Sequence, residues 1–445
     1  MSFNRRALAK KFVHFTVPSI LSMLAFSVYT MVDGMFVAKG VGEKALAAVN
    51  LSSPYNAAMF ACGLLIAVGM STVIAIKLGR GEQREASFLF TQNLVVSAAV
   101  SLVISAVTLL NLRRVALFLG ATQETLIYVM EYVGIVSPFA IFFICAYNME
   151  VLVKTDGAPQ LSVLGVSSAG LTNVVLDWLF VMKLGWGVKG AAFATGLAQV
   201  VSIVIYCIYF AKYSNCLHFT KFQWNLPIYR KTIPLGVADG ITEFSNGIVI
   251  FLFNQTILGL LGEDGVVSYT VIGYINTFIL MMMSGTAQGM QPISSMHFGR
   301  NEMKSCRFLL RLGLGAGLAF GVGGWAACTF LGGPIVSLFI RPDSPLFAPS
   351  VHAVRVYALA FPLMGLNVIS AAFFTSVGQA GRSFPISVGR GLIFPVLAVL
   401  FIPRLAGPEG IWLAGAAAEA ACFALTALFM AGYRRGAGQE SRVAA

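Results

Sequence analysis

The sequence predicts an all-α polytopic membrane protein, and three observations support that prediction. Of its 445 residues, 58% are apolar and only 11% are charged, whereas soluble globular chains carry about 25% charged residues. The apolar residues form continuous runs rather than an alternating pattern, which argues against a transmembrane β-barrel. The basic start, residues 1–11, leads directly into a full-length apolar run, so no cleavable signal peptide is expected.

Twelve apolar runs are long enough to cross a bilayer, which needs about 20 residues of helix. Their approximate limits are 12–38, 46–76, 88–110, 124–153, 161–182, 190–211, 233–261, 266–297, 308–331, 351–376, 385–403 and 411–432. Several runs exceed the length that the hydrocarbon core requires, so tilt or protrusion beyond the membrane is expected.

The basic residues predict the orientation, because cytoplasmic segments of membrane proteins are enriched in Lys and Arg. With the N-terminus inside, 21 of the 30 Lys and Arg residues fall on the cytoplasmic side. We therefore expect a multi-pass protein of the plasma (inner) membrane with both termini cytoplasmic. The net charge of +12 is then explained by topology, and no nucleic-acid partner is expected.

The chain repeats itself at a shift of 220 residues. The polar loop Gly79-Arg80-x-Glu82 falls on Gly299-Arg300-x-Glu302 without a gap. Six spans followed by six spans in the same orientation indicate a parallel duplication about an axis along the membrane normal. We therefore expect an N-lobe at 1–211, a cytoplasmic linker on the membrane surface at 212–232, a C-lobe at 233–433 and a cytoplasmic tail at 434–445.

Four polar residues of the N-lobe are predicted to form one site. Asp33, Asp177 and Thr195 each lie about five residues, or ~7.5 Å, from the outer end of their spans, and Asn173 lies one turn before Asp177 on the same helix face. Buried carboxylates are costly and usually mark function. Two acids in one cavity disfavour joint ionisation, and their oxygens suit a hard cation, so the group predicts an H⁺ or Na⁺ site. The alternative is that each carboxylate only caps or snorkels near a helix end.

The C-lobe offers candidates for substrate contact. Glu243 and Glu419 lie within spans 7 and 12 and are candidates for a substrate-cation contact or a second proton site. Gln288 and Met282 of span 8 are tentative lining residues of a substrate cavity, although such residues more often simply pack. Arg390 is expected either to pair with an acid or to snorkel, and snorkelling is the favoured interpretation.

A duplicated helical bundle of this size is typical of a secondary transporter that works by alternating access. An ion channel is the less favoured alternative, because channels usually build one pore from identical subunits. No Walker A pattern is present. The four histidines stand alone, without a catalytic motif, so we expect no enzymatic activity, no cofactor and no metal beyond Na⁺ at the N-lobe site.

Several motifs give the chain a family resemblance. They are Val32-Asp33-Gly-Met-Phe-Val37, Lys154-Thr-Asp-Gly-Ala-Pro159, Asn173-Val-Val-Leu-Asp177, Gly187-Val-Lys-Gly-Ala-Ala192 and Gln291-Pro292. With them the chain resembles the multidrug and toxic compound extrusion (MATE) family of secondary transporters over nearly its whole length.

The resemblance implies a V-shaped pair of six-helix lobes that exports organic, often cationic, compounds in exchange for H⁺ or Na⁺. It assigns the N-lobe cation site to Asp33, Asn173, Asp177 and Thr195, and it implies a bend of span 1 at Pro18. The expected partners are small organic molecules and the lipid bilayer, and the protein is expected to be a monomer. The alternative is a flippase of lipid-linked precursors, which has related architecture but needs a strongly cationic cavity.

Overall fold

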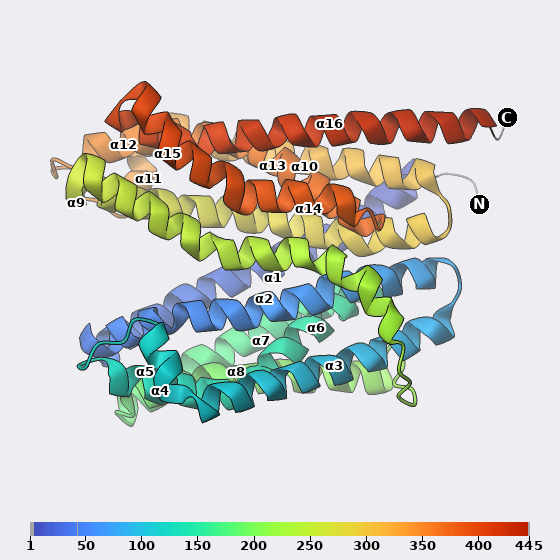
Figure 1. Cartoon of the computed structure of the whole chain (residues 1–445), viewed down its shortest axis with the longest axis horizontal. Coiled ribbons are helices and arrows are strands. Elements are labelled where there is room, and N and C mark those ends of the chain that lie inside the picture. The colour runs from blue at the N-terminus through green and yellow to red at the C-terminus, as the bar shows by residue number, and fades with distance from the viewer. Residues whose placement is uncertain (1–3, 42, 444–445) are drawn as a thin grey trace.

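The structure is a computed structural model that describes residues 4–41 and 43–443, with the side chains of 37–39, 43–47, 50 and 434–443 left undescribed. Within these residues it contains helices and no strand. Figure 1 shows two helical lobes, with α2 to α8 in one and α9 to α16 in the other. The predicted all-α fold with two lobes is therefore confirmed, while the residue limits of the lobes stay predictions.

The first half of the chain forms the N-lobe. Its helices are α1 (Arg5–Gly40), α2 (Glu43–Gly79), α3 (Gln83–Leu110), α4 (Leu112–Phe118), α5 (Leu126–Val136), η1 (Ser137–Phe139), α6 (Ala140–Asp156), α7 (Pro159–Asp177), η2 (Trp178–Lys183) and α8 (Gly187–Lys212). The short α4 lies in the connection between α3 and α5. The 3-10 turn η1 joins α5 to α6 within one membrane crossing.

The second half forms the C-lobe. Its helices are η3 (Leu226–Ile228), α9 (Tyr229–Gly299), α10 (Met303–Phe330), α11 (Gly332–Val336), α12 (Phe347–Tyr357), η4 (Ala358–Ala360), α13 (Phe361–Ser376), α14 (Ala380–Val388), η5 (Gly389–Ile393), α15 (Phe394–Ala406), η6 (Pro408–Leu413) and α16 (Ala414–Val443).

Eleven helical segments of the described chain are long and apolar enough to cross a membrane. One of them, 226–299, has 74 residues and contains two helices that meet at Gly262 (φ 71°, ψ −164°). It accounts for two crossings, which gives the twelve expected spans. The connection predicted at 262–265 is shorter than expected, because glycine adopts a backbone conformation that lets one residue make the turn.

Most helices extend a few residues beyond the predicted spans. For example, α3 begins at Gln83 rather than at residue 88, and α10 begins at Met303 rather than at residue 308. Hydropathy detects only the part of a helix that crosses the hydrocarbon, whereas backbone hydrogen bonding continues through the headgroup layer.

The internal repeat produces the same turn twice. Lys77 Nζ lies 2.5 Å from a Glu82 carboxylate oxygen, and at the matching positions His297 Nδ1 lies 2.6 Å from Glu302. The hydrogen bond from His297 lowers the pKa of Glu302, and the bond from Lys77 lowers the pKa of Glu82. The third residue of each Gly-Arg-x-Glu turn has a positive φ, 80° and 60°. The duplication read from the sequence is therefore also present in local structure.

The two lobes touch through a reciprocal pair of glycines. A Cβ atom added at Gly79 would lie 2.1 Å from the Met296 carbonyl oxygen, and one added at Gly299 would lie 2.1 Å from the Ile76 carbonyl oxygen. Both contacts lie where α2 and α9 end. Larger residues at these glycines would push the backbones apart, so the sequence permits close packing of the lobes at this end.

Helix α1 belongs to both lobes. Near its start, Leu8, Phe12 and Phe15 are buried in the hydrophobic core of the C-lobe. Further along, Ser22 Oγ lies 2.9 Å from Ser162 Oγ of α7, in the N-lobe. Figure 1 shows α1 crossing from one lobe to the other along its length. A movement of one lobe against the other must therefore act on α1.

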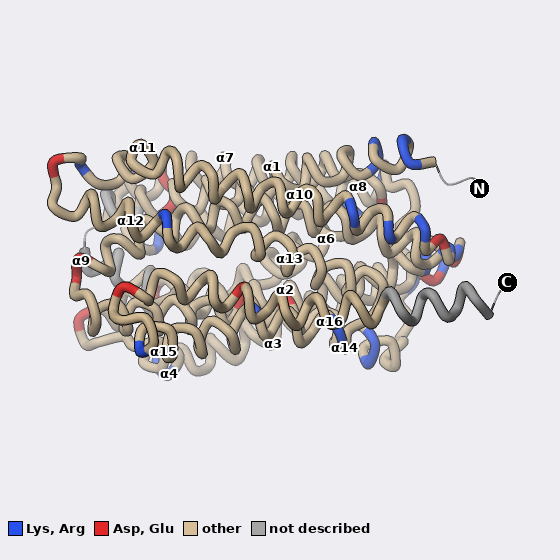
Figure 2. The backbone as a smooth tube through the Cα atoms, turned by 90° about the horizontal axis from the view of Figure 1, so that it is seen from above, with Lys and Arg blue, Asp and Glu red and all other residues tan. Residues whose placement is uncertain are grey.

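Charged residues are concentrated near the two ends of the bundle. Figure 2 shows most of the Lys and Arg residues at the end that holds the N-terminus, and few charges along the middle of the helices. At the same end, residues 213–225 connect α8 to η3 without a helix. The molecule therefore has a wide apolar belt and one strongly basic end.

Candidate cation site in the N-lobe

The four residues predicted for the N-lobe site come from three helices. Asp33 lies on α1, Asn173 and Asp177 lie one turn apart on α7, and Thr195 lies on α8. The carboxyl group of Asp33 interacts with both the Asp177 carboxyl group and the Asn173 carboxamide. Asn173 and Asp177 are 1% and 0% exposed. The structure therefore brings the two acids together inside the lobe.

The backbone changes directly after Asp177. Helix α7 ends there and continues as the π-helical segment η2, in which Leu184 N–H donates to the Leu179 carbonyl oxygen at 2.9 Å. Such π-turns widen a helix locally and are frequent at functional sites. The ammonium group of Lys183 lies 5.4 Å from the centre of the Trp178 ring. It therefore contacts an aromatic ring at the end of the segment rather than the Asp177 carboxylate.

The polar atoms of the site are poorly satisfied by protein. Asp33 Oδ1, both carboxylate oxygens of Asp177 and both amide atoms of Asn173 are buried, and within the described structure they have no partner at standard hydrogen-bond geometry. No basic side chain that the structure describes forms an ion pair with either acid. An unsatisfied buried polar group costs about 1–3 kcal/mol. The oxygen-rich donor set therefore fits a proton or a small hard cation.

A tyrosine that the sequence pattern did not single out lies near the two acids. Tyr132 on α5 interacts electrostatically with Asp33 and Asp177 and through its hydroxyl group with Thr195. Asn56 Nδ2 on α2 donates to the Tyr132 hydroxyl oxygen at 3.3 Å. A search of span 4 for polar residues near its outer end would have found Tyr132. The site therefore draws on five helices rather than three.

Thr195 could contribute to such a site only through its oxygen lone pairs. Its hydroxyl group donates to the Ala191 carbonyl oxygen at 2.9 Å, which uses its only hydrogen. The hydroxyl oxygen can then act only as an acceptor or a cation ligand. This arrangement agrees with a supporting position beside two carboxyl groups.

Pro18 lies away from this site. Helix α1 continues through Pro18, although the proline ring removes one backbone hydrogen bond and favours a bend. Asp33 follows 15 residues later, which corresponds to about 22 Å along the helix axis. A hinge at Pro18 would therefore act between the lobe contacts and the acids, and this role stays a prediction.

The C-lobe acid has a different environment. Arg390 Nε donates to Glu419 Oε1 at 2.9 Å, and Asn367 Nδ2 donates to Glu419 Oε2 at 2.8 Å. Thr426 Oγ1 donates to Asn367 Oδ1 at 3.0 Å. The favoured interpretation of Arg390 as a snorkelling residue is wrong, because its side chain pairs with Glu419. Glu419 is only 7% exposed, and a buried carboxylate is strongly destabilised when it lacks a cationic partner.

Gln288 binds a buried lysine of the opposite lobe. Lys154 Nζ on α6 donates to Glu150 Oε1 at 2.7 Å and to Gln288 Oε1 on α9 at 2.8 Å. Ser162 Oγ donates to the same Glu150 oxygen at 2.8 Å. Lys154 is 1% exposed. The structure therefore places this tentative cavity residue in a contact between the lobes.

Glu243 also lies at the boundary between the lobes. Glu243 and Asp239 of α9 interact electrostatically with Tyr147 of α6, whose ring is 4.9 Å from that of Phe60. Met282 is partly exposed on the second half of α9. The candidate cavity residues thus fall into separate environments, two of them at the lobe boundary and Glu419 inside the C-lobe.

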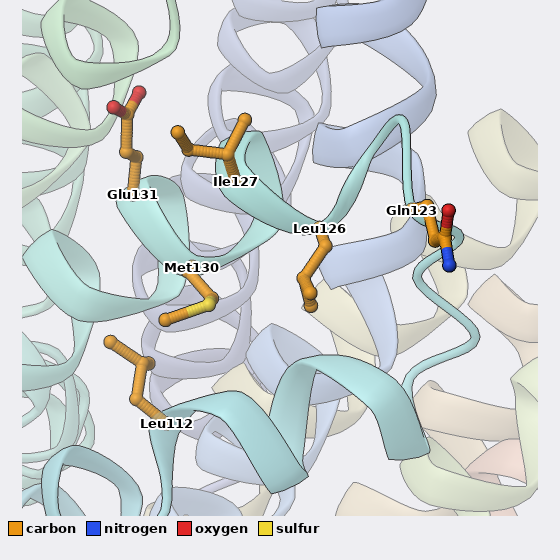
Figure 3. A pocket seen from close by; sticks show the side chains of 6 residues that line it. All are labelled: Leu112, Gln123, Leu126, Ile127, Met130 and Glu131. Atoms are coloured by element: carbon orange, nitrogen blue, oxygen red, sulfur yellow. The ribbon is translucent and has the colours of Figure 1, made fainter.

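A groove of about 520 Å³ lies elsewhere, between α4 and α5 of the N-lobe. Its lining residues are Leu112, Gln123, Leu126, Ile127, Met130 and Glu131 (Figure 3). None of them belongs to the predicted site. The groove gives no reason to move the candidate site away from the carboxylate pair.

The sequence profile of the MatE family matches residues 18–179 and 243–400, on both lobes. The chain belongs to the MATE family. It is similar to the multidrug export protein MepA of Staphylococcus aureus (strain N315), with 24% identity over 435 residues that cover 96% of this chain and 94% of MepA. MepA of Staphylococcus haemolyticus (strain JCSC1435) is also 24% identical, with the same coverage.

Solved structures show the same fold. A multidrug resistance MATE family transporter in an outward-facing conformation superposes with a TM-score of 0.88 at 21% identity and covers 98% of this chain and 97% of its own. A MOP superfamily transporter from Pyrococcus furiosus has a TM-score of 0.85 at 22% identity, with 96% coverage of each chain. The MATE resemblance and the V-shaped fold are thus confirmed, and the chain is a multi-pass membrane protein.

Proposed function

We propose that this MATE protein exports organic, often cationic, compounds in exchange for H⁺ or Na⁺. The observation that supports this most is the buried pair Asp33 and Asp177, which has no cationic partner in the described structure. Relatives named as multidrug export proteins, aligned over 96% of this chain, support the substrate class. The protein would act as a monomer in the plasma membrane with both termini cytoplasmic, in line with the basic end of Figure 2.

The transporter would alternate between two states, one with H⁺ or Na⁺ bound at the acid pair and one with substrate bound. Two adjacent carboxylates in a low-dielectric site repel each other, so a proton or Na⁺ stabilises the pair. Helix α1 supplies Asp33 and is buried in the C-lobe through Phe12 and Phe15. A change of α1 on ion binding would therefore bias the contact between the lobes. This is the two-state element that alternating access requires.

A flippase of lipid-linked precursors is not favoured. Such a protein needs accessible positive charge for a pyrophosphate group. The charge of Arg390 is compensated by Glu419 at 2.9 Å, and Arg355 is exposed on α12. The polar residues at the lobe boundary include two acids, Asp239 and Glu243, which suit a cation better than a phosphate.

The test is transport of an ethidium-like dye by everted membrane vesicles that contain the protein, driven separately by a proton gradient and by a sodium gradient. We expect one gradient to drive dye movement in the wild type and in Asp264→Asn, an exposed acid at the turn between the first two C-lobe spans. Asp177→Asn should lose the movement. Dye movement that needs neither gradient, or an unchanged Asp177→Asn, would contradict the proposal.

A further inference from the structure

The first part of the linker is fixed to the N-lobe through its backbone. The buried carboxylate of Asp156, at the end of α6, accepts hydrogen bonds from the backbone N–H groups of Asn215 (2.8 Å), Cys216 (2.9 Å) and Leu217 (2.7 Å). Charge-assisted bonds of this kind are stronger than neutral ones. This part of the linker therefore moves with the N-lobe.

Helix α3 binds the next part of the linker in the same way. Thr220 N–H donates to Thr91 Oγ1 at 3.0 Å. Asn225 N–H donates to Gln92 Oε1 at 3.0 Å, and Gln92 Nε2 donates back to the Asn225 carbonyl oxygen at 3.2 Å. The backbone of residues 214–225 is thus held against the lobe along its length, and we call residues 213–226 the linker strap.

The side chains of the linker strap expose much apolar surface. Phe219 is 48% exposed, Phe222 is 38% exposed, Trp224 is 66% exposed and Leu226 is 62% exposed. The rings of Phe222 and Trp224 stack edge to face at 4.8 Å. The Phe219 ring also contacts the buried Phe90 of α3 at 5.3 Å, so Phe222 and Trp224 are the rings of the strap that are available to a partner.

The charged side chains of the strap and of the residues next to it in sequence are all basic. Lys212, Lys221, Arg230 and Lys231 are exposed in and beside the strap, and residues 178–238 contain no Asp or Glu. Aromatic rings combined with Lys and Arg suit the interface of a bilayer, where the rings enter the headgroup layer and the cations meet phosphates. A surface that is exposed to water in a soluble protein more often carries charges of both signs.

We propose that the linker strap binds anionic phospholipid headgroups of the leaflet next to the basic end of the molecule. The strap is joined to the N-lobe by these hydrogen bonds and continues into the C-lobe through η3, so bound lipid would hold the N-lobe at the membrane surface while the C-lobe moves. Lipid binding does not depend on which ion drives transport, so failure of one proposal leaves the other standing.

Trp224 provides the probe. The full-length protein is reconstituted in vesicles of phosphatidylglycerol and phosphatidylcholine at a fixed ratio, in which either one or the other lipid has brominated acyl chains that quench tryptophan. The Trp224 signal is the difference between wild type and Trp224→Phe, which alters only an exposed ring. We expect that signal to be quenched about twofold more when phosphatidylglycerol is brominated, with the preference lost at high salt.

Charge variants identify the source of the preference. The phosphatidylglycerol preference should be lost in a triple variant that combines Lys221→Gln, Arg230→Gln and Lys231→Gln. It should remain in a control triple variant at the opposite end of the bundle that combines Arg113→Gln, Arg114→Gln and Lys189→Gln. Equal quenching by the two brominated lipids in the wild type would overturn the headgroup claim. A Trp224 signal that no lipid quenches, or that changes only with protein concentration, would overturn lipid binding and point to a soluble partner or a second copy.

Discussion

Two buried acid sites, one in each lobe, have opposite environments. In the N-lobe, Asp33 and Asp177 lie together with polar neighbours but without a described cationic partner. In the C-lobe, Glu419 is held by Arg390 at 2.9 Å and by Asn367 at 2.8 Å. A buried carboxylate that already has its cation is a structural ion pair, whereas a pair of carboxylates without one must take a proton or a cation from solution.

The difference is informative because the lobes are repeats of each other. Matching turns with Lys77–Glu82 and His297–Glu302 show that the duplication kept these two loops. The buried acids lie at positions that the repeat does not relate, Asp177 on span 5 and Glu419 on span 12. We infer that the lobes have divided their work, with ion coupling in the N-lobe and stable packing around Glu419 in the C-lobe.

The strongest way to break this comparison is to neutralise an acid on the N-lobe side. Asp33→Asn keeps the shape but cannot titrate, so ion-driven exchange should fall at least about tenfold while the protein still reaches the membrane, because removing a buried charge removes a desolvation cost. Dye exchange in proteoliposomes, normalised to the amount of inserted protein, measures this. Wild-type exchange by a well-inserted Asp33→Asn protein would remove the coupling role from Asp33.

On the C-lobe side the expected loss is one of stability. Arg390→Met leaves Glu419 buried without its cation, which should lower the free energy of unfolding by about 3–5 kcal/mol. Arg390→Met combined with Glu419→Met should recover most of that loss, because no buried charge remains. Thermal unfolding in detergent compares the three proteins. If Arg390→Met alone is as stable as the wild type, the ion pair does not stabilise the fold.

A smaller effect is expected where the lobes meet. Gln288→Leu removes the hydrogen bond from Lys154 but leaves the Glu150–Lys154 pair in place, so it should shift the balance between lobe conformations by about 1 kcal/mol. Distances between spin labels on the two lobes report the shift, and Gln123→Leu, in a loop of the N-lobe, serves as the matched control. Identical distance distributions for Gln288→Leu and the control would rule out a locking contact.

The smallest change concerns Thr195. Its hydroxyl group already donates to Ala191, so Thr195→Ala removes one neutral oxygen from the site and should reduce exchange by only about two- to fivefold. Thr195→Ser, which keeps the hydroxyl group, should retain more activity than Thr195→Ala. A loss as complete as that of Asp33→Asn would make Thr195 an essential ligand rather than a supporting one.

Sequence alone predicted the parts of this structure that depend on one helix at a time. The apolar runs gave twelve spans, and residue depth along three helices grouped Asp33, Asn173, Asp177 and Thr195, which the structure brings into one region of the N-lobe. These features depend on periodicity and on membrane thickness, which a single chain records directly.

The parts that sequence could not predict depend on packing between distant segments. Lys154 meets Gln288 across 134 residues of chain, and Tyr132 of α5 faces acids from α1 and α7. The pairing of Arg390 with Glu419 required knowing which faces of α16 and η5 meet. Helical periodicity fixes the face of one helix, whereas the rotation of neighbouring helices against each other is set by packing.

The most direct test of the account is the exchange rate of Asp177→Asn in proteoliposomes, measured against pH and against Na⁺ concentration. The account predicts that the wild-type rate depends on one of these ions and that Asp177→Asn has a rate near background with no dependence on either, while it still binds dye in detergent. A variant that keeps both the wild-type rate and the wild-type ion dependence would make the carboxylate pair structural and contradict the central claim.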